Sequence, residues 1–142
     1  MIVEHAELTV EAGREEDFEA VFEKAREPKQ ARSTPPNRGV SVIVEHAELT
    51  VEAGREEDFE AVFEKAREVL AEADGFRWAE LLRCVERPRT FLLLVGWESV
   101  EAHTVGFRES ERFQRWRSLV GPFFAEPPAV EHYRELGARF AG

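Results

Sequence analysis

One of the four histidines, His103, is followed along the chain by aromatic residues at helical spacing. An imidazole titrates near neutral pH, so His103 can serve as a general base, or it can simply satisfy a helix end. The stripe formed by Phe107, Phe113 and Trp116 is typical of a packed core and also of an aromatic pocket. These residue types suggest proton transfer beside an apolar surface.

Two further titratable residues stand on predicted strands. Glu45 falls on the apolar face of the alternating stretch 43–51. Buried, its carboxyl would have a raised pKa, whereas at a sheet edge it would reach solvent, and we favour the edge interpretation. His132 lies on the last predicted strand, where we interpret it as part of a subunit contact.

Several other kinds of site are missing from the sequence. It has no Cys/His cluster with metal-ligand spacing, no glycine-rich phosphate loop and no assignable Ser-His-Asp set. The net charge of −10 and arginines that alternate with acids argue against nucleic-acid binding. Cys84 is the only cysteine, which excludes an internal disulfide and suits a reducing compartment. We predict no metal site and no nucleic-acid partner.

The elements that must position these residues follow from periodicity. Alternation predicts strands, and apolar residues at helical spacing predict helices that end at Gly75 and at Gly121-Pro122. A turn containing Pro88 separates the second and third strands, and the nearly all-apolar third strand is expected to be central. Ser99 is a candidate cap for a helix that Gly106 interrupts. The predicted strands are 43–51, 76–86, 91–98 and 129–136, with helices after the first and third, which gives an α+β, ferredoxin-like βαββαβ sandwich.

The segment 2–27 returns without a change at 43–68. Surface positions normally drift, so the identity indicates a very recent or deliberate duplication. We divide the chain into 1–27, a duplicated strand and helix called copy one; 28–42, a flexible linker rich in Pro, Ser and Arg; and 43–142, the main domain. The segment 43–68 is called copy two.

A ferredoxin-like sheet has one place for its first strand and helix, so the copies compete. Copy two is expected to win, because it is contiguous with the domain and its helix continues into Val69 and Leu70, whereas Pro28 follows copy one. Copy one would then exchange with a neighbouring chain, or do nothing.

Location and membrane contact are predicted from the ends and the apolar runs. The start of the chain carries Glu4, His5 and Glu7 where a signal peptide needs an apolar core, and no run is long enough to span a membrane. We expect a soluble, cytoplasmic protein without a membrane partner.

Three stretches, WESVEAH at 97–103, FRESERFQRWRSL at 107–119 and PPAVEHYREL at 127–136, resemble the antibiotic biosynthesis monooxygenase family over residues 42–142. The resemblance implies a homodimeric α/β barrel joined sheet to sheet, with a cavity between sheet and helices. It also implies oxidation of a phenolic or quinol-type molecule by O₂ without metal, flavin or other cofactor. A haem-degrading branch instead uses an Asn and a Trp where this chain has Ala47 and Gly106, which argues against haem degradation.

The chemistry that the resemblance implies needs a base, apolar walls and a partner for developing negative charge. For these roles it implies His103 as the catalytic base and Arg83 as the anion partner, with the substrate held by Trp78, Trp97, Phe107, Phe113 and Trp116. A small aromatic substrate and a second copy of the chain, domain-swapped or in a higher oligomer, are the expected partners. A second hypothesis is an engineered protein for strand exchange, in which activity is incidental.

Overall fold

A computed structural model describes residues 1–17 and 42–137 of the chain. These residues belong to two compact units. The larger contains residues 42–135, and the smaller contains residues 1–17 with Leu136 and Gly137. The rest of copy one and the predicted linker up to residue 41 lie outside the described residues.

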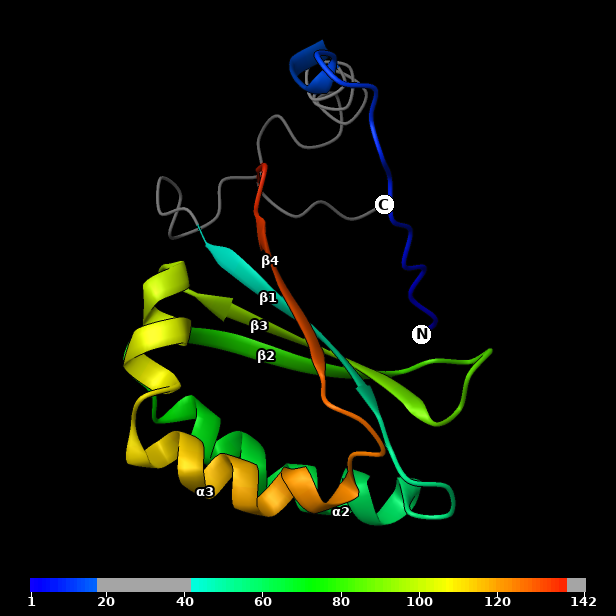
Figure 1. Cartoon of the computed structure of the whole chain (residues 1–142), viewed down its shortest axis with the longest axis vertical. Coiled ribbons are helices and arrows are strands. Elements are labelled where there is room, and N and C mark those ends of the chain that lie inside the picture. Colours follow the sequence, from blue (N-terminus) through cyan, green and yellow to red (C-terminus); the bar gives the residue numbers. More distant parts are fainter. Residues whose placement is uncertain (18–41, 138–142) are drawn as a thin grey trace. The chain divides into compact units, whose positions relative to one another are not determined.

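Four antiparallel strands form one sheet in the larger unit (Figure 1). They are β1 Ile43–Thr50, β2 Phe76–Arg83, β3 Thr90–Trp97 and β4 Ala129–Arg134, in the spatial order β2-β3-β1-β4. Copy two supplies β1, and the nearly all-apolar β3 is internal, as the sequence predicts. The βαββαβ order and this strand order confirm the ferredoxin-like α+β fold.

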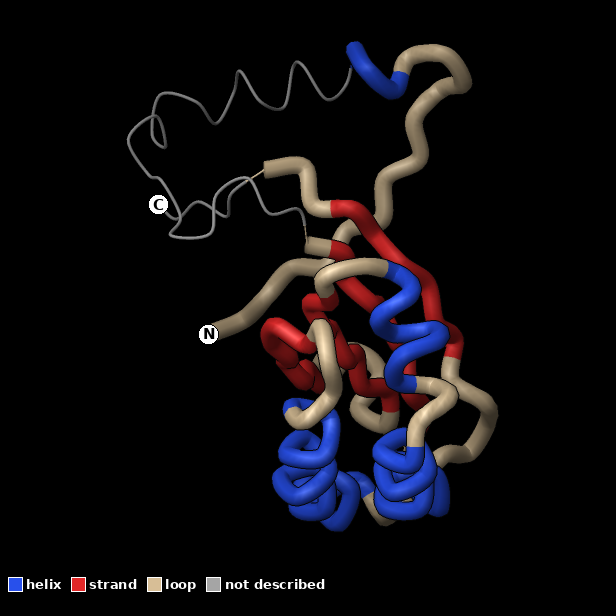
Figure 2. The backbone as a smooth tube through the Cα atoms, turned by 90° about the vertical axis from the view of Figure 1, so that its left-hand side faces the viewer, coloured by secondary structure: helices blue, strands red, loops and turns tan. Residues whose placement is uncertain are grey.

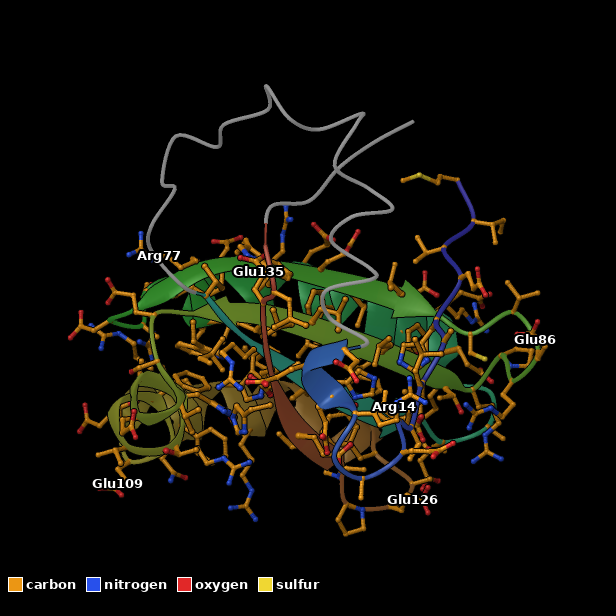
Figure 3. All side chains as sticks on the ribbon, turned by 90° about the horizontal axis from the view of Figure 1, so that it is seen from above. Arg14, Arg77, Glu86, Glu109, Glu126 and Glu135 are labelled. Carbon is orange, nitrogen blue, oxygen red and sulfur yellow. The ribbon has the colours of Figure 1, made fainter. Side chains whose placement is uncertain are left out.

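Two long helices, α2 Glu56–Ala71 and α3 Glu111–Val120, lie on one face of the sheet (Figures 1 and 2). Alternation along β1 turns Ala47 and Leu49 towards the helices, where both are buried. Phe59 of α2 is 0% exposed and its ring packs edge-on against Phe91 of β3 at 5.0 Å. Charged side chains such as Arg77, Glu86, Glu109 and Glu126 lie around the periphery (Figure 3). One core therefore joins the helices to the sheet.

The connection between β3 and α3 differs from a simple interrupted helix. Residues 100–101 begin it as an α-helix, and Ala102–Phe107 (η1) then form a π-helix, in which the Arg108 N–H donates to the His103 carbonyl at 3.0 Å. Ser99 Oγ accepts from the Ala102 N–H at 3.0 Å, which confirms the predicted cap. Gly106 lies within η1 and does not end it. A 3₁₀ turn, η2 Gly121–Phe123, closes α3.

The smaller unit contains a turn in copy one and no strand within the described residues. Residues 2–10 have no regular structure, and helical residues begin at Glu15 after a turn through Gly13. The prediction that copy one repeats the strand is therefore wrong for the described residues, where β3 and β4 pair with β1 of copy two.

Candidate active site

Glu45 is a buried carboxylate on the central strand β1, 7% exposed. Its Oε1 accepts a hydrogen bond from Trp97 Nε1 of β3 at 3.0 Å. Burial raises the pKa of this carboxyl above its usual range, while the Trp97 bond and the charge of Arg108 act in the opposite direction. The edge interpretation of Glu45 is wrong, because β1 lies between β3 and β4 and turns this side chain under the helices.

His103 reaches Glu45 from η1 and is 3% exposed. Its Nε2 lies 3.4 Å from Glu45 Oε1, and its ring stacks on Trp97 with centroids 5.3 Å apart and planes 19° apart. The π-helix widens the turn that carries His103, a distortion that often occurs at functional sites. His103 thus lies between the Trp97 ring and a carboxylate from the sheet.

His132 completes a row of three titratable groups. It stands directly opposite Glu45 in the β1–β4 register, and its Nε2 is 2.8 Å from Nδ1 of His103. Its side chain is only partly buried. The structure shows a contact of His132 inside the chain, on the helix face of β4; the interpretation of His132 as part of a subunit contact stays a prediction.

The charge state of the row is set by burial and by Arg108, which follows η1. Burial lowers the pKa of His103 to about 4, and the charges of Arg108 and His132 add to this effect. Burial also lowers the pKa of His132, again with Arg108. Both imidazoles are therefore uncharged at neutral pH. Arg108 itself is exposed, and its positive charge acts on both uncharged rings.

Aromatic rings continue the site towards α3. Phe107 is 3% exposed and its ring lies 5.6 Å from Trp97 and 5.6 Å from Phe113. Trp116 lies 6.5 Å from Phe107 and packs edge-on against Phe63 of α2 at 5.9 Å. The structure thus brings four of the five predicted wall residues into one connected cluster with His103.

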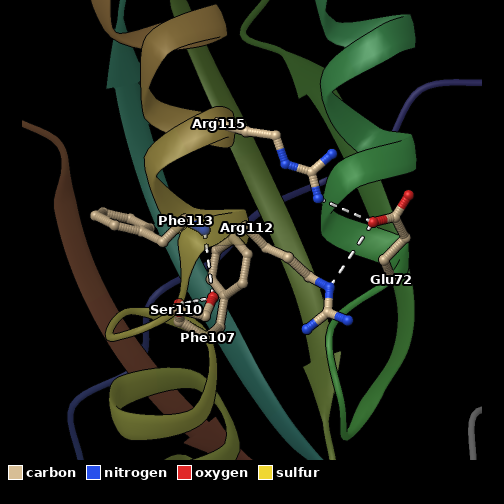
Figure 4. Close-up of polar contacts among 6 residues, drawn as sticks. All are labelled: Glu72, Phe107, Ser110, Arg112, Phe113 and Arg115. Atoms are coloured by element: carbon tan, nitrogen blue, oxygen red, sulfur yellow. Dashed lines mark hydrogen bonds and ion pairs between the residues drawn. The ribbon is translucent and has the colours of Figure 1, made fainter.

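Polar contacts hold the aromatic helix in place (Figure 4). Ser110 caps α3 by accepting from the Phe113 N–H at 3.4 Å, and its hydroxyl donates to the Phe107 carbonyl at 2.6 Å. Arg115 and Arg112 of α3 reach Glu72, just after α2, at 3.2 and 3.7 Å. Since these ion pairs are exposed, the cap and the apolar contacts fix the helix more firmly.

Two predicted residues lie apart from this cluster. Trp78 of β2 pairs with Gly96 and covers it on the face of the sheet away from the helices, where it is 36% exposed. Arg83 pairs with Phe91, six positions along β3 from Trp97, or roughly 20 Å at the usual strand rise. Its guanidinium binds Glu60 at 3.1 Å and the Pro88 carbonyl at 2.7 Å. Arg83 was predicted as the anion partner, whereas the positive charge that acts on both histidines is that of Arg108.

Sequence reasoning missed the roles of Glu45, His132 and Arg108. The sequence did mark Glu45, which is an acid on the apolar face of the strand predicted at 43–51. It also marked His132, which stands two residues after the apolar Val130 and so faces the same side of its strand. Arg108 stands five residues after His103. This spacing gains a meaning only in the π-helix, where the Arg108 N–H bonds to the His103 carbonyl.

Within residues 1–17 and 42–137, no group of three His, Cys, Asp or Glu side chains is arranged to hold a metal ion. In the same part of the chain, none of the helices has the length and apolar character needed to cross a bilayer.

Comparison with known proteins gives one consistent assignment. The family model of antibiotic biosynthesis monooxygenases matches residues 42–119. A Bordetella bronchiseptica protein assigned to that family is 45% identical, with a TM-score of 0.66 over 67% of this chain and 97% of that one. SnoaB, a cofactor-independent oxygenase from Streptomyces nogalater, has the same fold at 19% identity, with a TM-score of 0.53 over 72% of this chain and 97% of its own. The uncharacterized protein YczJ of Bacillus subtilis strain 168 is 37% identical over 68 residues, which cover 48% of this chain and 72% of YczJ.

Proposed function

The chain belongs to the antibiotic biosynthesis monooxygenase family, and on that premise we propose that its domain oxidises a small phenolic or quinol-type molecule with O₂, using no metal or flavin. The observation that carries the proposal is His103, an uncharged imidazole buried between Trp97 and a carboxylate at the start of an aromatic cluster. Such a group can accept a phenolic proton in a site that excludes water.

The substrate supplies the electrons in this reaction. Removal of its phenolic proton gives an electron-rich anion, which passes one electron to O₂. The resulting radical and superoxide combine to form a C–O bond. The base returns its proton to the peroxide anion, which gives a hydroperoxide. Where the reacting carbon still carries a hydrogen, the O–O bond then breaks. One oxygen remains as the carbonyl of a quinone, and the other leaves as water with that hydrogen and the returned proton.

Each part of the cluster has a proposed role. His103 accepts the proton, and Trp97, Phe107, Phe113 and Trp116 hold the aromatic substrate. Arg108 stabilises the phenolate, since its positive charge already acts to lower the pKa of Glu45 and of His103. Trp78 and Arg83 lie outside this proposed site.

The test is oxygen uptake by the full chain with substituted hydroquinones and anthrones. We expect uptake that falls about a hundredfold or more in His103→Gln, the range that loss of a general base produces. His5→Gln, which changes a histidine of copy one, is the control and should leave the rate unchanged. Lack of uptake with every compound, or full activity in His103→Gln, would refute the proposal.

We also propose a homodimer through the sheet face opposite the helices, as the family resemblance implies. Trp78 and Tyr133 are large apolar side chains on that face and are 36% and 43% exposed. A second copy would cover both. Light scattering should show a dimer for the full chain and a shift towards monomer for Trp78→Glu. A dimer that is unchanged in Trp78→Glu would contradict an interface on this face of the sheet.

A second candidate role rests on the repeat itself, and it is that of a spare first strand. Residues 2–10 are identical to 43–51 and stand outside any strand, with Ile2 80% exposed and Leu8 65% exposed. Every side-chain contact that β1 makes is therefore available to copy one. Copy two is favoured only by its continuation into the buried Val69 and Leu70. We propose that copy one of the same chain replaces β1 when copy two is disabled.

A double-mutant cycle in the full chain tests this exchange. Ala47→Asp places a charge at a buried position of β1 and Ala6→Asp makes the same change in copy one. If copies exchange, Ala6→Asp alone has little effect, but added to Ala47→Asp it removes the remaining folded protein. If Ala6→Asp changes nothing in either background, copy one does not enter the sheet.

A further inference from the structure

Glu45, His103 and His132 form a row of three groups that can each accept a proton. Both ring nitrogens of His103 already face partners within the protein, Nδ1 towards His132 at 2.8 Å and Nε2 towards Glu45 at 3.4 Å. A substrate proton therefore reaches His103, the base of the proposed function, through one of these partners. His132 is the less buried imidazole, on the edge strand β4, and its Nδ1 is the nitrogen of the row that is not engaged with another member.

The number of protons on the two imidazoles determines which ring nitrogens of the row donate and which accept. Each uncharged imidazole carries one N–H, and the contact between the two rings needs one proton. When His132 donates it from Nε2, the proton of His103 stands on Nε2 and faces the carboxylate of Glu45. The lone pair of His132 Nδ1 is then free to accept.

We propose that Glu45, His103 and His132 form a proton relay in which the substrate, as defined by the proposed function, gives its proton to Nδ1 of His132. The Nε2 proton of His132 then moves to Nδ1 of His103, and the Nε2 proton of His103 moves to Glu45. One proton enters and three N–H or O–H bonds form as three break. Neither imidazole ends charged, and both change tautomer.

The environment favours this direction of transfer. A proton at Glu45 removes a buried negative charge, and burial raises the pKa of that carboxyl. A proton left on either imidazole would place a positive charge near Arg108, which lowers the pKa of both rings. The groups that face the row are Glu45 from β1, Trp97 from β3, His103 and Arg108 from η1 and its cap, and His132 from β4. The longer 3.4 Å step becomes a hydrogen bond when His103 and Glu45 approach by a few tenths of an ångström.

Trp97 acts as a positioning residue for the relay. Its indole N–H donates to the same Oε1 that faces His103, and its ring stacks on the imidazole. One side chain of β3 therefore orients both the buried acceptor and the central ring.

The relay can be tested without substrate, by long-range ¹H–¹⁵N NMR of the histidine rings in the full chain. The four histidines are assigned by single His→Gln variants. We expect His103 and His132 to carry Nε2–H at high pH and to switch together to Nδ1–H at one shared midpoint as the pH falls. Neither ring should become an imidazolium in that step.

Glu45→Gln removes the final acceptor while keeping an oxygen for the Trp97 N–H, whose indole signal reports that the site is still folded. The shared tautomer switch should disappear in this variant, and also in His132→Gln for His103. Glu4→Gln makes the same change in copy one and should leave the switch as it is. Separate titrations of the two rings to imidazolium, or a switch that persists in Glu45→Gln, would overturn the relay. A failed oxygen assay would contradict only the proposed function.

Discussion

The chain carries the segment 2–17 again as 43–58, and the structure folds the two segments differently. Both make the same turn: Gly13 and Gly54 have φ of 88° and 86°, and the Arg14 and Arg55 N–H groups donate to Glu11 and Glu52 at 3.0 and 3.1 Å. Only copy two makes a strand. Leu49 is 3% exposed there, whereas Leu8, the same residue in copy one, is 65% exposed.

The comparison separates local from non-local causes of structure. A turn closes through hydrogen bonds between residues three apart, so its sequence is sufficient. A strand needs neighbours, and β1 has β3 on one side and β4 on the other. The same reasoning applies to chemistry, because Glu45 becomes a buried acceptor only where Trp97 and His103 come to meet it.

The largest expected difference between the copies comes from truncating the same leucine in each. Leu49→Ala removes buried side-chain volume from the core and should lower the free energy of unfolding by about 3 kcal/mol, within the usual range for such cavities. Leu8→Ala removes an exposed side chain and should change it by less than about 0.5 kcal/mol. Urea unfolding of the full chain measures both. Equal losses would mean that copy one belongs to the folded core.

The same distinction explains how much of the fold the sequence predicts. The alternation of 43–51, the apolar run at 91–98 and the stop signals at Gly75 and Gly121-Pro122 are local patterns, and they predict the elements and their order. The strand predicted for copy one failed because alternation shows which face a residue would take, without showing that a neighbouring strand exists.

The candidate site was less predictable, because its contacts join distant parts of the chain. The Glu45 carboxylate meets an indole 52 residues away, and His103 meets His132 across 29 residues. The π-helix that turns His103 inward depends on a hydrogen bond between residues five apart, which no letter pattern marks. His103 and the aromatic stripe were proposed from their residue types and helical spacing together with the family resemblance.

The pH dependence of stability offers a second test of the comparison. The pKa of His103 falls from 6.5 to about 4 on folding, so between these values the unfolded chain binds more protons. Stability should therefore fall as the pH drops from about 6.5 to about 4, by about 3 kcal/mol from this group. The raised pKa of Glu45 contributes with the opposite sign, since it favours the folded state in acid.

Comparing a variant with the unchanged chain isolates the contribution of His103 to the pH dependence of stability. Thermal unfolding of His103→Gln across this pH range should show a smaller loss in acid than the unchanged chain. His5→Gln, in copy one, should reproduce the unchanged chain. If the loss of stability in acid is the same in His103→Gln, another group causes it. That result would contradict the assignment of His103 as a buried, uncharged imidazole.

The turn shared by both copies gives the smallest and most closely matched difference. Alanine at Gly54 meets no atom within 4 Å, so its effect comes only from a left-handed backbone at φ 86°. In the domain this turn joins β1 to α2 and cannot relax, and Gly54→Ala should lower the free energy of unfolding by about 1 kcal/mol. Gly13 has the same conformation, but residues 2–10 form no strand that fixes it. Gly13→Ala should therefore leave the unfolding of the domain unchanged by the same thermal measurement. Since the two substitutions have the same sequence context and differ in φ by only 2°, any loss in Gly13→Ala would have to come from a contribution of copy one to the folded domain.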